Sequence, residues 1–566
     1  MSDDKEKAEL DDAQVNGNEA IERGHDPVTV EKLGLGKVTS KLFTWGVETR
    51  GIYPVPLHQR VDRNFHKIFF IWLAMNFNIL SFSAGTSGPL VYSLGLRDSC
   101  LLILFINLLC CIPPAYMSTW GPKLGLRTMC LSRYSFGFYC ISVPCILGLA
   151  TMTGFMILNC ILGGQTLSAV SGGDLSWTVG IVIIAILSLL LSFCGYSVLN
   201  WKVLSYERLS WIPVLIVYLV ALGVGGKHLS DPPPSEPATA EHILTFASVL
   251  AGFVLTYCPM GCDFTTYMDS RVSQWRIFWY SYLGFIIPVI TIQCLGAAFA
   301  VSIPVVPSWS AAYVDQSLGD LFVAVLRPTG GFGKFLIVLL SLSVTANIAP
   351  TMYSFGLTFQ VFIPYCAHLP RFVFAVLATA IVIPLSIVGA HRYYATLTNF
   401  LGLIGYWASN FIAVVLVEHF LFRAHPEWFL PSSTTTTTSS PSLSKHSPTP
   451  NSALMNKNST GDPFAQYLLR DWNTPSLLPS GIPALLSSII SYGLVIPCMD
   501  QAWFIGPVAQ KTGDIGFEVA FILTVLFYVP LRWVEVDGWT LVYEAIILGA
   551  LDTDTVLDYR QWQKEQ

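Results

Sequence analysis

The amino-acid sequence predicts an all-α integral membrane protein with twelve transmembrane helices, arranged as a five-plus-five inverted-repeat core and two further helices. Three observations lead to this fold class. Hydrophobic residues make up 53% of the 566 residues and charged residues only 12%, whereas soluble domains carry roughly 25% charged residues. The mean hydropathy is +0.56. Apolar segments of bilayer length recur along the chain, and two of them are interrupted by glycine and proline.

The chain is polar and acidic over residues 1–57. This stretch is expected to be a disordered cytosolic tail without a cleavable signal peptide. Residues 58–430 should form the ten-helix core, 431–481 a Ser/Thr-rich cytosolic linker, 482–533 the last two helices and 534–566 a cytosolic tail. The expected spans are 68–92, 98–119, 136–166, 176–196, 205–226, 242–263, 277–303, 334–360, 371–389, 396–421, 482–500 and 515–533.

The orientation follows from basic residues in the short loops, which favour the cytosolic side. One side of the predicted membrane carries most of them: Lys123, Arg127, Arg133, Lys202, Arg208, Arg271 and Arg276. The basic residues just before the first span lie on the same side. Both termini are therefore expected in the cytosol.

Composition also argues against several classes of protein. The net charge of −5 lies partly in the acidic tail and argues against a nucleic-acid partner. The 13 cysteines and ten histidines show no spacing typical of a metal site, so no metal or organic cofactor is expected. Glu418 and His419 are neighbours on a helix and point about 100° apart, so they do not form a catalytic pair. We expect a protein that is not an enzyme and has no catalytic residues.

The first interrupted segment, 76–90, contains Gly85, Gly88 and Pro89. In hydrocarbon an unwound turn persists only where it lines a cavity or is buried by neighbours. Its carbonyls, its amides and the dipole ends of two half-helices can hold a polar ligand, together with the Ser83 hydroxyl. The alternative is a close helix crossing, which small residues permit.

The second interrupted segment, 255–263, contains Tyr257 and Pro259 and ends at Asp263. Two broken helices at corresponding places in two halves of a chain indicate an inverted-repeat secondary transporter. Asp263 is a candidate ion or proton site. A salt bridge with Arg271 is an equally good interpretation.

Three further spans carry polar residues, which are costly in hydrocarbon and indicate function. Phe155 and Asn159 share one helix face and combine an aromatic plate with a carboxamide. Packing alone also explains Phe155. In the eighth segment Pro350 frees a carbonyl beside Asn347, although a structural kink would need only the proline. Glu207 opens the fifth segment and has either a gating role or an interfacial ion pair.

Four motifs occur in order along the chain: FSAGTSGPL at 82–90, GPKLGLRTMCLSRYSFG at 121–137, YERLSWIP at 206–213 and NIAPTMYSFGLTFQ at 347–360. With them, the chain from about residue 60 to 532 resembles the fungal purine-cytosine permeases of the nucleobase:cation symporter-1 family. The resemblance implies a leucine-transporter-type fold and proton-coupled uptake of nucleobases across the plasma membrane.

The resemblance also implies roles for individual residues. Five positions match the family's functional residues: Ser83, Asn159, Glu207, Asn347 and Pro350. Three positions depart from it, because Phe155 and Tyr257 replace the usual tryptophans and Thr351 replaces an asparagine. Phenylalanine and tyrosine still stack on a planar base, with a smaller area. Thr351 keeps a hydroxyl but loses a donor and acceptor pair.

We therefore expect alternating access, with a nucleobase (cytosine, adenine, guanine or hypoxanthine) stacked between Phe155 and Tyr257. The predicted substrate-binding residues are Ser83, Gly85, Phe155, Asn159, Tyr257, Asn347, Pro350 and Thr351. A proton is the expected coupling ion, with Glu207 and Asp263 as candidate carriers. Two alternatives stay open: a transporter of another small heterocycle, such as a nucleoside, hydantoin or vitamin, and a non-transporting nucleobase sensor.

Overall fold

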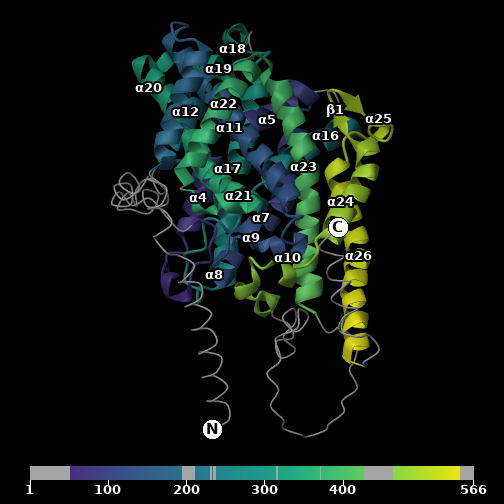
Figure 1. Cartoon of the computed structure of the whole chain (residues 1–566). Coiled ribbons are helices and arrows are strands. Elements are labelled where there is room, and N and C mark those ends of the chain that lie inside the picture. The colour runs from purple at the N-terminus through teal and green to yellow at the C-terminus, as the bar shows by residue number, and fades with distance from the viewer. Residues whose placement is uncertain are drawn as a thin grey trace. The chain divides into compact units, whose positions relative to one another are not determined.

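The computed structural model describes residues 51–193, 211–229, 233, 237–313, 316–369, 371–425 and 463–547. Glu207 lies outside these ranges, as do most of the predicted N-terminal tail and most of the predicted linker. The longer helices (Figure 1) are α4 Lys67–Asn76, α5 Ile79–Tyr92, α6 Leu96–Cys110, α11 Ser142–Ser171, α12 Trp177–Phe193, α15 Trp211–Gly225, α16 Ala240–Leu255, α17 Gln274–Ser302, α19 Leu318–Leu326, α20 Gly331–Leu342, α21 Thr345–Phe362, α22 Arg371–Gly389, α23 Tyr393–Val417, α24 Ile482–Val495 and α26 Gly516–Ile547. The short elements are α7 Ile112–Met117, α8 Trp120–Leu124, α9 Thr128–Leu131, α10 Arg133–Phe136, α18 Pro307–Ala312, α25 Ala509–Thr512 and the antiparallel pair β1 Asp500–Gln501 and β2 Phe504–Ile505.

The helices have the length and apolarity of membrane spans. Within the described residues, eight are able to cross a bilayer, and α4 with α5 makes a ninth, bent by 53°. One of the eight is the 51-residue run Val373–Arg423, which is far longer than a bilayer core of about 30 Å needs at 1.5 Å per residue. The mainly helical membrane fold is thus confirmed, while the number of twelve spans and the inverted repeat stay predictions.

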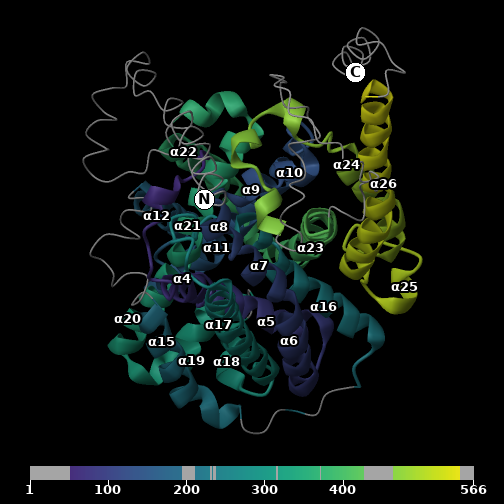
Figure 2. The same cartoon turned by 90° about the horizontal axis from the view of Figure 1, so that it is seen from below.

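The chain divides into two compact units. The larger one comprises the described residues up to Leu131, with 142–409 and 494–519. Within it, α17 packs along α4, α5 and α6, and α16 contacts α5 and α6; we call these five helices the α17 group. A second set, the α11 group, consists of α11, α12, α21 and α22, which contact one another (Figures 1 and 2). The two groups touch where α4 meets α21 and where α5 meets α11.

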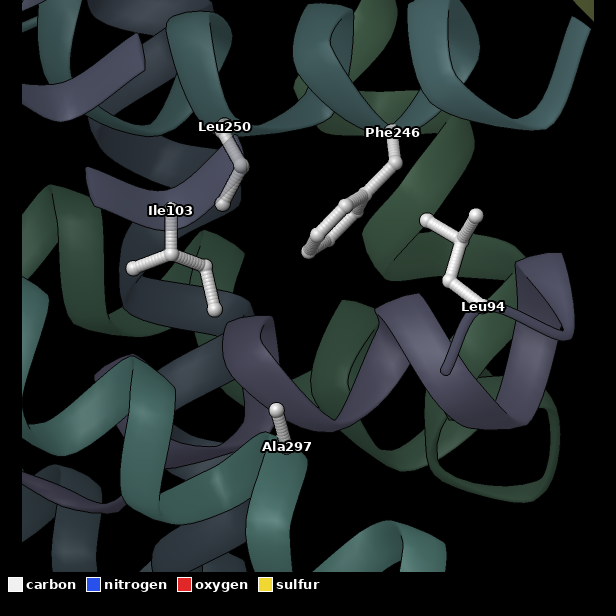
Figure 3. Close-up of a cluster of buried hydrophobic side chains, with 5 residues drawn as sticks. All are labelled: Leu94, Ile103, Phe246, Leu250 and Ala297. Atoms are coloured by element: carbon white, nitrogen blue, oxygen red, sulfur yellow. The ribbon is translucent and has the colours of Figure 1, made fainter. Parts of the chain in front are cut away.

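The α17 group has its own apolar centre (Figure 3). It is formed by Leu94, Ile103, Phe246, Leu250 and Ala297, each at most 2% exposed. These side chains come from α6, α16, α17 and the link after α5. Because lipid is as apolar as leucine, close packing rather than removal from water holds such helices together.

The predicted position of the first break is wrong. Gly85 and Gly88 lie inside the continuous helix α5, and the chain instead unwinds at Phe77 and Asn78, between α4 and α5. A Cβ atom on Gly85 would lie 1.9 Å from the carbonyl oxygen of Gln293 in α17. The glycines therefore serve a close helix crossing, the alternative that small residues allow.

The second interruption is present where it was expected. Helix α16 ends at Leu255, and a 3₁₀ turn at Cys258–Met260 leads into further turns that reach Asp263. A third joint was not expected: the eighth segment is divided into α20 and α21, with the break just before Asn347.

The predicted linker and tails differ from their expected bounds. Ile52 and Val55, assigned to the disordered tail, are buried. Helix α26 continues beyond residue 533 to Ile547. Residues 463–477, assigned to the linker, form three 3₁₀ turns, and we call this segment the strap. The composition of the preceding Ser/Thr-rich run is typical of a linker. The strap itself differs, because it contains aromatic residues.

The smaller unit contains residues 132–141, 410–493 and 520 onward. The strap docks within it, because Arg133 donates to the side chain of Asn473 at 2.7 Å and Tyr134 to the carbonyl of Leu468 at 2.7 Å. Glu418 is almost fully buried and accepts two hydrogen bonds from Arg532, at 3.0 and 3.1 Å. Neighbouring His419 instead lies 3.1 Å from the hydroxyl of Tyr467, so the two adjacent residues face different partners.

Candidate functional site

A chain of buried side-chain hydrogen bonds joins the two helix groups. Asn159 in α11 donates to the side-chain oxygen of Asn347 in α21 at 3.0 Å. Asn347 in turn donates to the carbonyl of Met75 in α4 at 2.9 Å and to the Tyr257 hydroxyl at 3.1 Å. Tyr257 donates to the side-chain oxygen of Asn76 at 3.0 Å. We call Asn76, Asn159, Tyr257 and Asn347 the amide network.

The two asparagines are held differently: Asn347 by residues outside its helix, Asn159 partly by its own helix. The second N–H of Asn159 donates to the carbonyl of Phe155, one turn earlier, at 2.9 Å. All donors of Asn159 and Asn347 are thus engaged, and the carbonyl partners fix which amide atom is the nitrogen. The side-chain oxygen of Asn159 is buried and has no hydrogen-bond partner among the described residues. It is an acceptor that a ligand with an N–H group can satisfy.

The predicted aromatic pair lies beside this network. The rings of Phe155 and Tyr257 are 6.3 Å apart between centroids and inclined by 30°. A base held between two rings needs roughly 7–8 Å, twice the contact distance of carbon atoms. Phe155 also touches Phe253 and Phe400 edge-on, at 6.0 and 5.6 Å. The two rings are in mutual contact, so stacking on both requires them to separate by about 1 Å.

Two predicted residues of α21 support Asn347. The Thr351 hydroxyl donates to the carbonyl of Asn347 at 2.7 Å, so it serves the helix backbone. Pro350 is buried inside the same helix and supplies no backbone donor. The structure thus places both residues within one turn of the network asparagine.

Ser83 and Gly85, two further predicted substrate-binding residues, lie in α5. Ser83 is fully buried beside the hydroxyls of Tyr393 and Tyr394 of α23. Thr86 lies 2.9 Å from the Tyr394 hydroxyl in the same cluster. Gly85 contacts α17. Ser83 therefore belongs to a second group of hydroxyls, between α5 and α23.

The two predicted coupling residues differ in what the structure shows. Glu207 lies outside the described residues. Asp263 is buried after the 3₁₀ turn, where its carboxylate accepts from the backbone N–H of Thr128 at 3.3 Å and its carbonyl from Arg127. Arg271, the partner considered for Asp263, donates its backbone N–H to Asp269 instead. That contact helps to lower the pKa of Asp269.

Sequence reasoning missed Asn76 and Asn78, which flank the actual break. Asn78 caps α5 by accepting from the N–H of Ser81 at 3.0 Å, while its amide donates to Met75 at 2.6 Å. These side chains form hydrogen bonds with backbone groups that have no helical partner at the break. Two asparagines within three residues of an apolar span were the available signal, because amides are costly in hydrocarbon.

A hollow of about 320 Å³ lies next to the aromatic pair. It is lined by Arg392, Ala395, Thr396, Asn399, Phe400, Leu403 and Trp503. Its volume is at the lower end of the roughly 300–1,000 Å³ of small-molecule sites. Phe400, which lines the hollow, contacts Phe155 edge-on at 5.6 Å.

Comparison with known sequences gives consistent matches. The model of a family described as permeases for cytosine/purines, uracil, thiamine and allantoin matches residues 54–436. The purine-cytosine permease fcyB of Emericella nidulans is 31% identical over 529 residues, which cover 90% of this chain and 96% of the relative. The purine-cytosine permease FCY21 of Saccharomyces cerevisiae is 29% identical, over 91% and 89% of the two chains. The vitamin B6 transporter TPN1 of Saccharomyces cerevisiae is 26% identical, over 88% and 89%.

Comparison with solved structures supports the fold. The closed conformation of Mhp1, a nucleobase-cation-symport-1 family transporter with bromovinylhydantoin bound, aligns with a TM-score of 0.60. The alignment covers 87% of this chain and 96% of Mhp1 at 14% identity. The inward-facing conformation of Mhp1 gives a TM-score of 0.55. The chain thus has an Mhp1-like fold.

Proposed function

Because the chain belongs to the family of permeases for cytosine/purines, uracil, thiamine and allantoin, we propose that it imports purine bases or cytosine together with a proton. The members of this family are permeases, and the chain is a transporter rather than an enzyme. Substrate, coupling ion and direction are the parts that we propose.

The observation that carries the proposal is the unsatisfied acceptor of the amide network. The Asn159 side-chain oxygen is buried between the two helix groups without a partner among the described residues. Cytosine, adenine, guanine and hypoxanthine all present N–H groups that can donate to it. A site built to hydrogen-bond one group rejects analogues that lack it, because its own buried atoms then stay unpaired.

Stacking supplies the remaining affinity in this proposal. Entry of a base separates the rings of Phe155 and Tyr257, now 6.3 Å apart, and loosens the contact between Asn159 and Asn347. Phe155 lies in α11 of the α11 group, whereas Tyr257 follows α16 of the α17 group. Separation of these two rings therefore couples substrate binding to the movement of one group against the other. Alternating access then delivers the base to the cytosol.

The proposed arrangement in the membrane has twelve crossings in a five-plus-five core with two further helices. Two shorter apolar helices and the 51-residue run Val373–Arg423, if it crosses twice, supply the crossings beyond the nine candidates. Both termini would lie in the cytosol of a plasma-membrane protein, by the distribution of basic loop residues.

The test is uptake of radiolabelled cytosine, adenine, guanine and hypoxanthine by cells that lack their own nucleobase transporters. Each uptake is measured at acidic and neutral external pH, and with sodium replaced by choline. We expect saturable uptake that increases as the external pH falls and does not depend on sodium. Uptake that follows sodium would replace the proton as coupling ion. If no base is taken up although the protein is present at the cell surface, the alternative of a non-transporting nucleobase sensor would be favoured.

Glu207 and Asp263 are the candidate carriers of the coupling proton. Glu207→Gln is expected to abolish the rise of uptake with acidity if this carboxylate binds the coupling proton. The same measurement on Asp263→Asn separates the two candidates. Unchanged pH dependence in both variants would dismiss them.

Transport of a vitamin B6-like heterocycle is the second candidate. The similarity to the vitamin B6 transporter TPN1 favours it. Labelled pyridoxine, offered to the same cells, is the test. Saturable pyridoxine uptake without uptake of any base would establish this candidate and exclude the first.

A further inference from the structure

A buried carboxylate cluster lies outside the amide network. Asp514, on the turn between α25 and α26, is 1% exposed. One of its carboxylate oxygens accepts from the Tyr406 hydroxyl in a short hydrogen bond and from the backbone N–H of Asp500 at 3.3 Å. The other accepts from the backbone N–H of Gly516 at 2.8 Å. The side-chain amide of Gln501 donates to Tyr406 at 2.8 Å and lies 3.4 Å from Asp514.

Among the described residues, the titratable groups shown to interact with Asp514 are two carboxylic acids, two tyrosines and a thiol. They are Tyr406 of α23, Asp500 of β1, Glu518 of α26, Cys498 before β1 and Tyr92 at the end of α5. Burial is the largest effect on Asp514 and raises the pKa of its carboxyl group. Hydrogen bonds from Tyr406 and from the backbone of Gly516 and Asp500 lower the pKa in part, and the negative charge of Asp500 is a smaller effect that raises it. The cluster therefore favours a bound proton more than an isolated surface carboxylate does.

A second observation identifies where that proton can be held. Gln501 is 4% exposed, and its side-chain oxygen is buried without a hydrogen-bond partner among the described residues. A carboxylate offers only acceptors, whereas a carboxylic acid adds one O–H donor. The amide that contacts Asp514 thus has one spare acceptor, and protonation of Asp514 creates one donor.

The cluster ties together two helices that lead to the amide network. Thr245 of α16 donates to the carboxylate of Asp500 at 3.1 Å and accepts from the backbone N–H of Asp514 at 3.1 Å. Tyr406 belongs to α23. The two helices also touch directly, because a Cβ atom on Gly252 would lie 2.0 Å from the carbonyl oxygen of Leu401.

Each of these helices reaches one side of the candidate site. Tyr257 follows the end of α16, and Phe400 of α23 contacts Phe155. The packing of α16 against α23 is thus connected by direct contacts to both aromatic residues of the pair. No residue of the cluster itself belongs to the predicted substrate site.

We propose that Asp514 is a proton-binding site of the transport cycle, whose ionised form locks α23 to α16 and whose protonated form releases them. A proton from the outside water adds to the carboxylate and gives a neutral acid, which loses its charge-assisted bond from Tyr406. The side-chain amide of Gln501, whose nitrogen now faces Asp514, turns over so that its oxygen accepts from the new O–H group. Hydrogen bonds to a charged group are about twice as strong as neutral ones, so the lock weakens. This inference rests on the proton coupling proposed above.

The test compares Asp514→Asn, which mimics the neutral acid in shape and charge, with the parent protein. Uptake is measured over a series of external pH values from acidic to neutral, because a raised pKa moves the change in protonation of Asp514 upward from the usual range of a carboxyl group. The ratio of the rates at the lowest and highest pH of the series is expected to be severalfold in the parent and to fall toward one in Asp514→Asn. Tyr406→Phe removes one bond to the carboxylate and is expected to move the midpoint to higher pH. Asp98→Asn, at the start of α6, is the matched control and should keep the parent profile.

The outcomes separate this inference from the proposed function. A parent whose uptake does not depend on pH refutes the proton coupling itself. A pH-dependent parent together with an unchanged profile in Asp514→Asn refutes only the role of Asp514.

A second measurement needs no substrate. A carboxyl group whose pKa is raised by folding adds stability at low pH, and this stability is lost as the pH rises through the folded pKa. The Tm of Asp514→Asn minus the Tm of the parent, both measured in detergent, should therefore increase as the pH increases from about 4.5 to about 7.5. A constant difference between the two Tm values would overturn the proposal.

Discussion

The side-chain amide of Asn159 donates to the side-chain oxygen of Asn347 at 3.0 Å, although the two residues are 188 positions apart in the chain. Asn347 donates its two side-chain N–H groups to the carbonyl of Met75 and to the hydroxyl of Tyr257. One asparagine thus connects α11, α21, α4 and the turn after α16. Within the network, the Asn159 side-chain oxygen has no partner among the described residues and is the acceptor left for a ligand.

Replacing Asn347 by alanine is expected to raise KM for the transported base roughly 5- to 150-fold, because each buried group left unpaired costs about 1–3 kcal/mol. The concentration dependence of uptake measures this. Asn107→Ala is the matched control: Asn107 is equally buried, and its partner Gln293, at 2.8 Å, lies outside the network. If both variants lose expression alike and neither changes KM, the network has only a structural role.

Replacing Tyr257 by phenylalanine tests whether the hydroxyl or the ring matters. The ring stays packed between Trp72 and Phe285, at 5.7 and 5.4 Å, while Asn76 loses its donor. We expect KM to rise about tenfold, which corresponds to about 1.4 kcal/mol. Tyr282→Phe, which removes a hydroxyl bonded to Leu108 at 2.8 Å, should leave KM unchanged. An unaltered KM in Tyr257→Phe would assign the residue to stacking alone.

Replacing Gly85 by alanine should destabilise the protein by about 1–3 kcal/mol or more, because the added methyl group meets the α17 backbone. Gly223→Ala, in α15, is the control, since its Cβ atom would have no neighbour within 4 Å. Thermal unfolding in detergent compares the two variants. A Gly85→Ala protein of normal stability with altered substrate affinity would restore Gly85 as a ligand-binding position.

Replacing Glu418 by glutamine should cost about 3–5 kcal/mol of stability, because buried Arg423 then loses its carboxylate and Arg532 keeps only Glu535. Arg63→Gln provides the contrast. Arg63 pairs with Asp269, but its side chain is 73% exposed, and such surface pairs contribute about 0–1 kcal/mol. The difference in Tm between the two variants is the measurement, and equal shifts would contradict the expectation.

The sequence was sufficient to bring Asn159 and Asn347 to one site, because costly amides at mid-span have to meet partners. It misled at Gly85 and Gly88, where the same residues that interrupt a helix in water allow two helices to touch in lipid. The real break depends on Asn76 and Asn78, whose side chains satisfy the backbone groups released there.

Other features depend on contacts that no local pattern reveals. Asp514 lies in a turn between helices, where polar residues are ordinarily solvated. It is buried only because β1 and α25 fold back against α16 and α23. The strap was obscured by the Ser/Thr-rich run before it, although Phe464, Tyr467 and Trp472 break that composition.

The docking of the strap has a consequence for the order of synthesis. Arg133 is buried against Trp472 and Asn473, residues that the ribosome adds about 340 positions later. At roughly 5–20 residues per second, this guanidinium waits about 20–70 s for those two contacts. A newly made chain therefore carries an incomplete loop ahead of α11 until almost the whole protein has been translated. Substitutions at Trp472 or Asn473 should accordingly act on the yield of newly inserted molecules, while those that mature transport with normal KM.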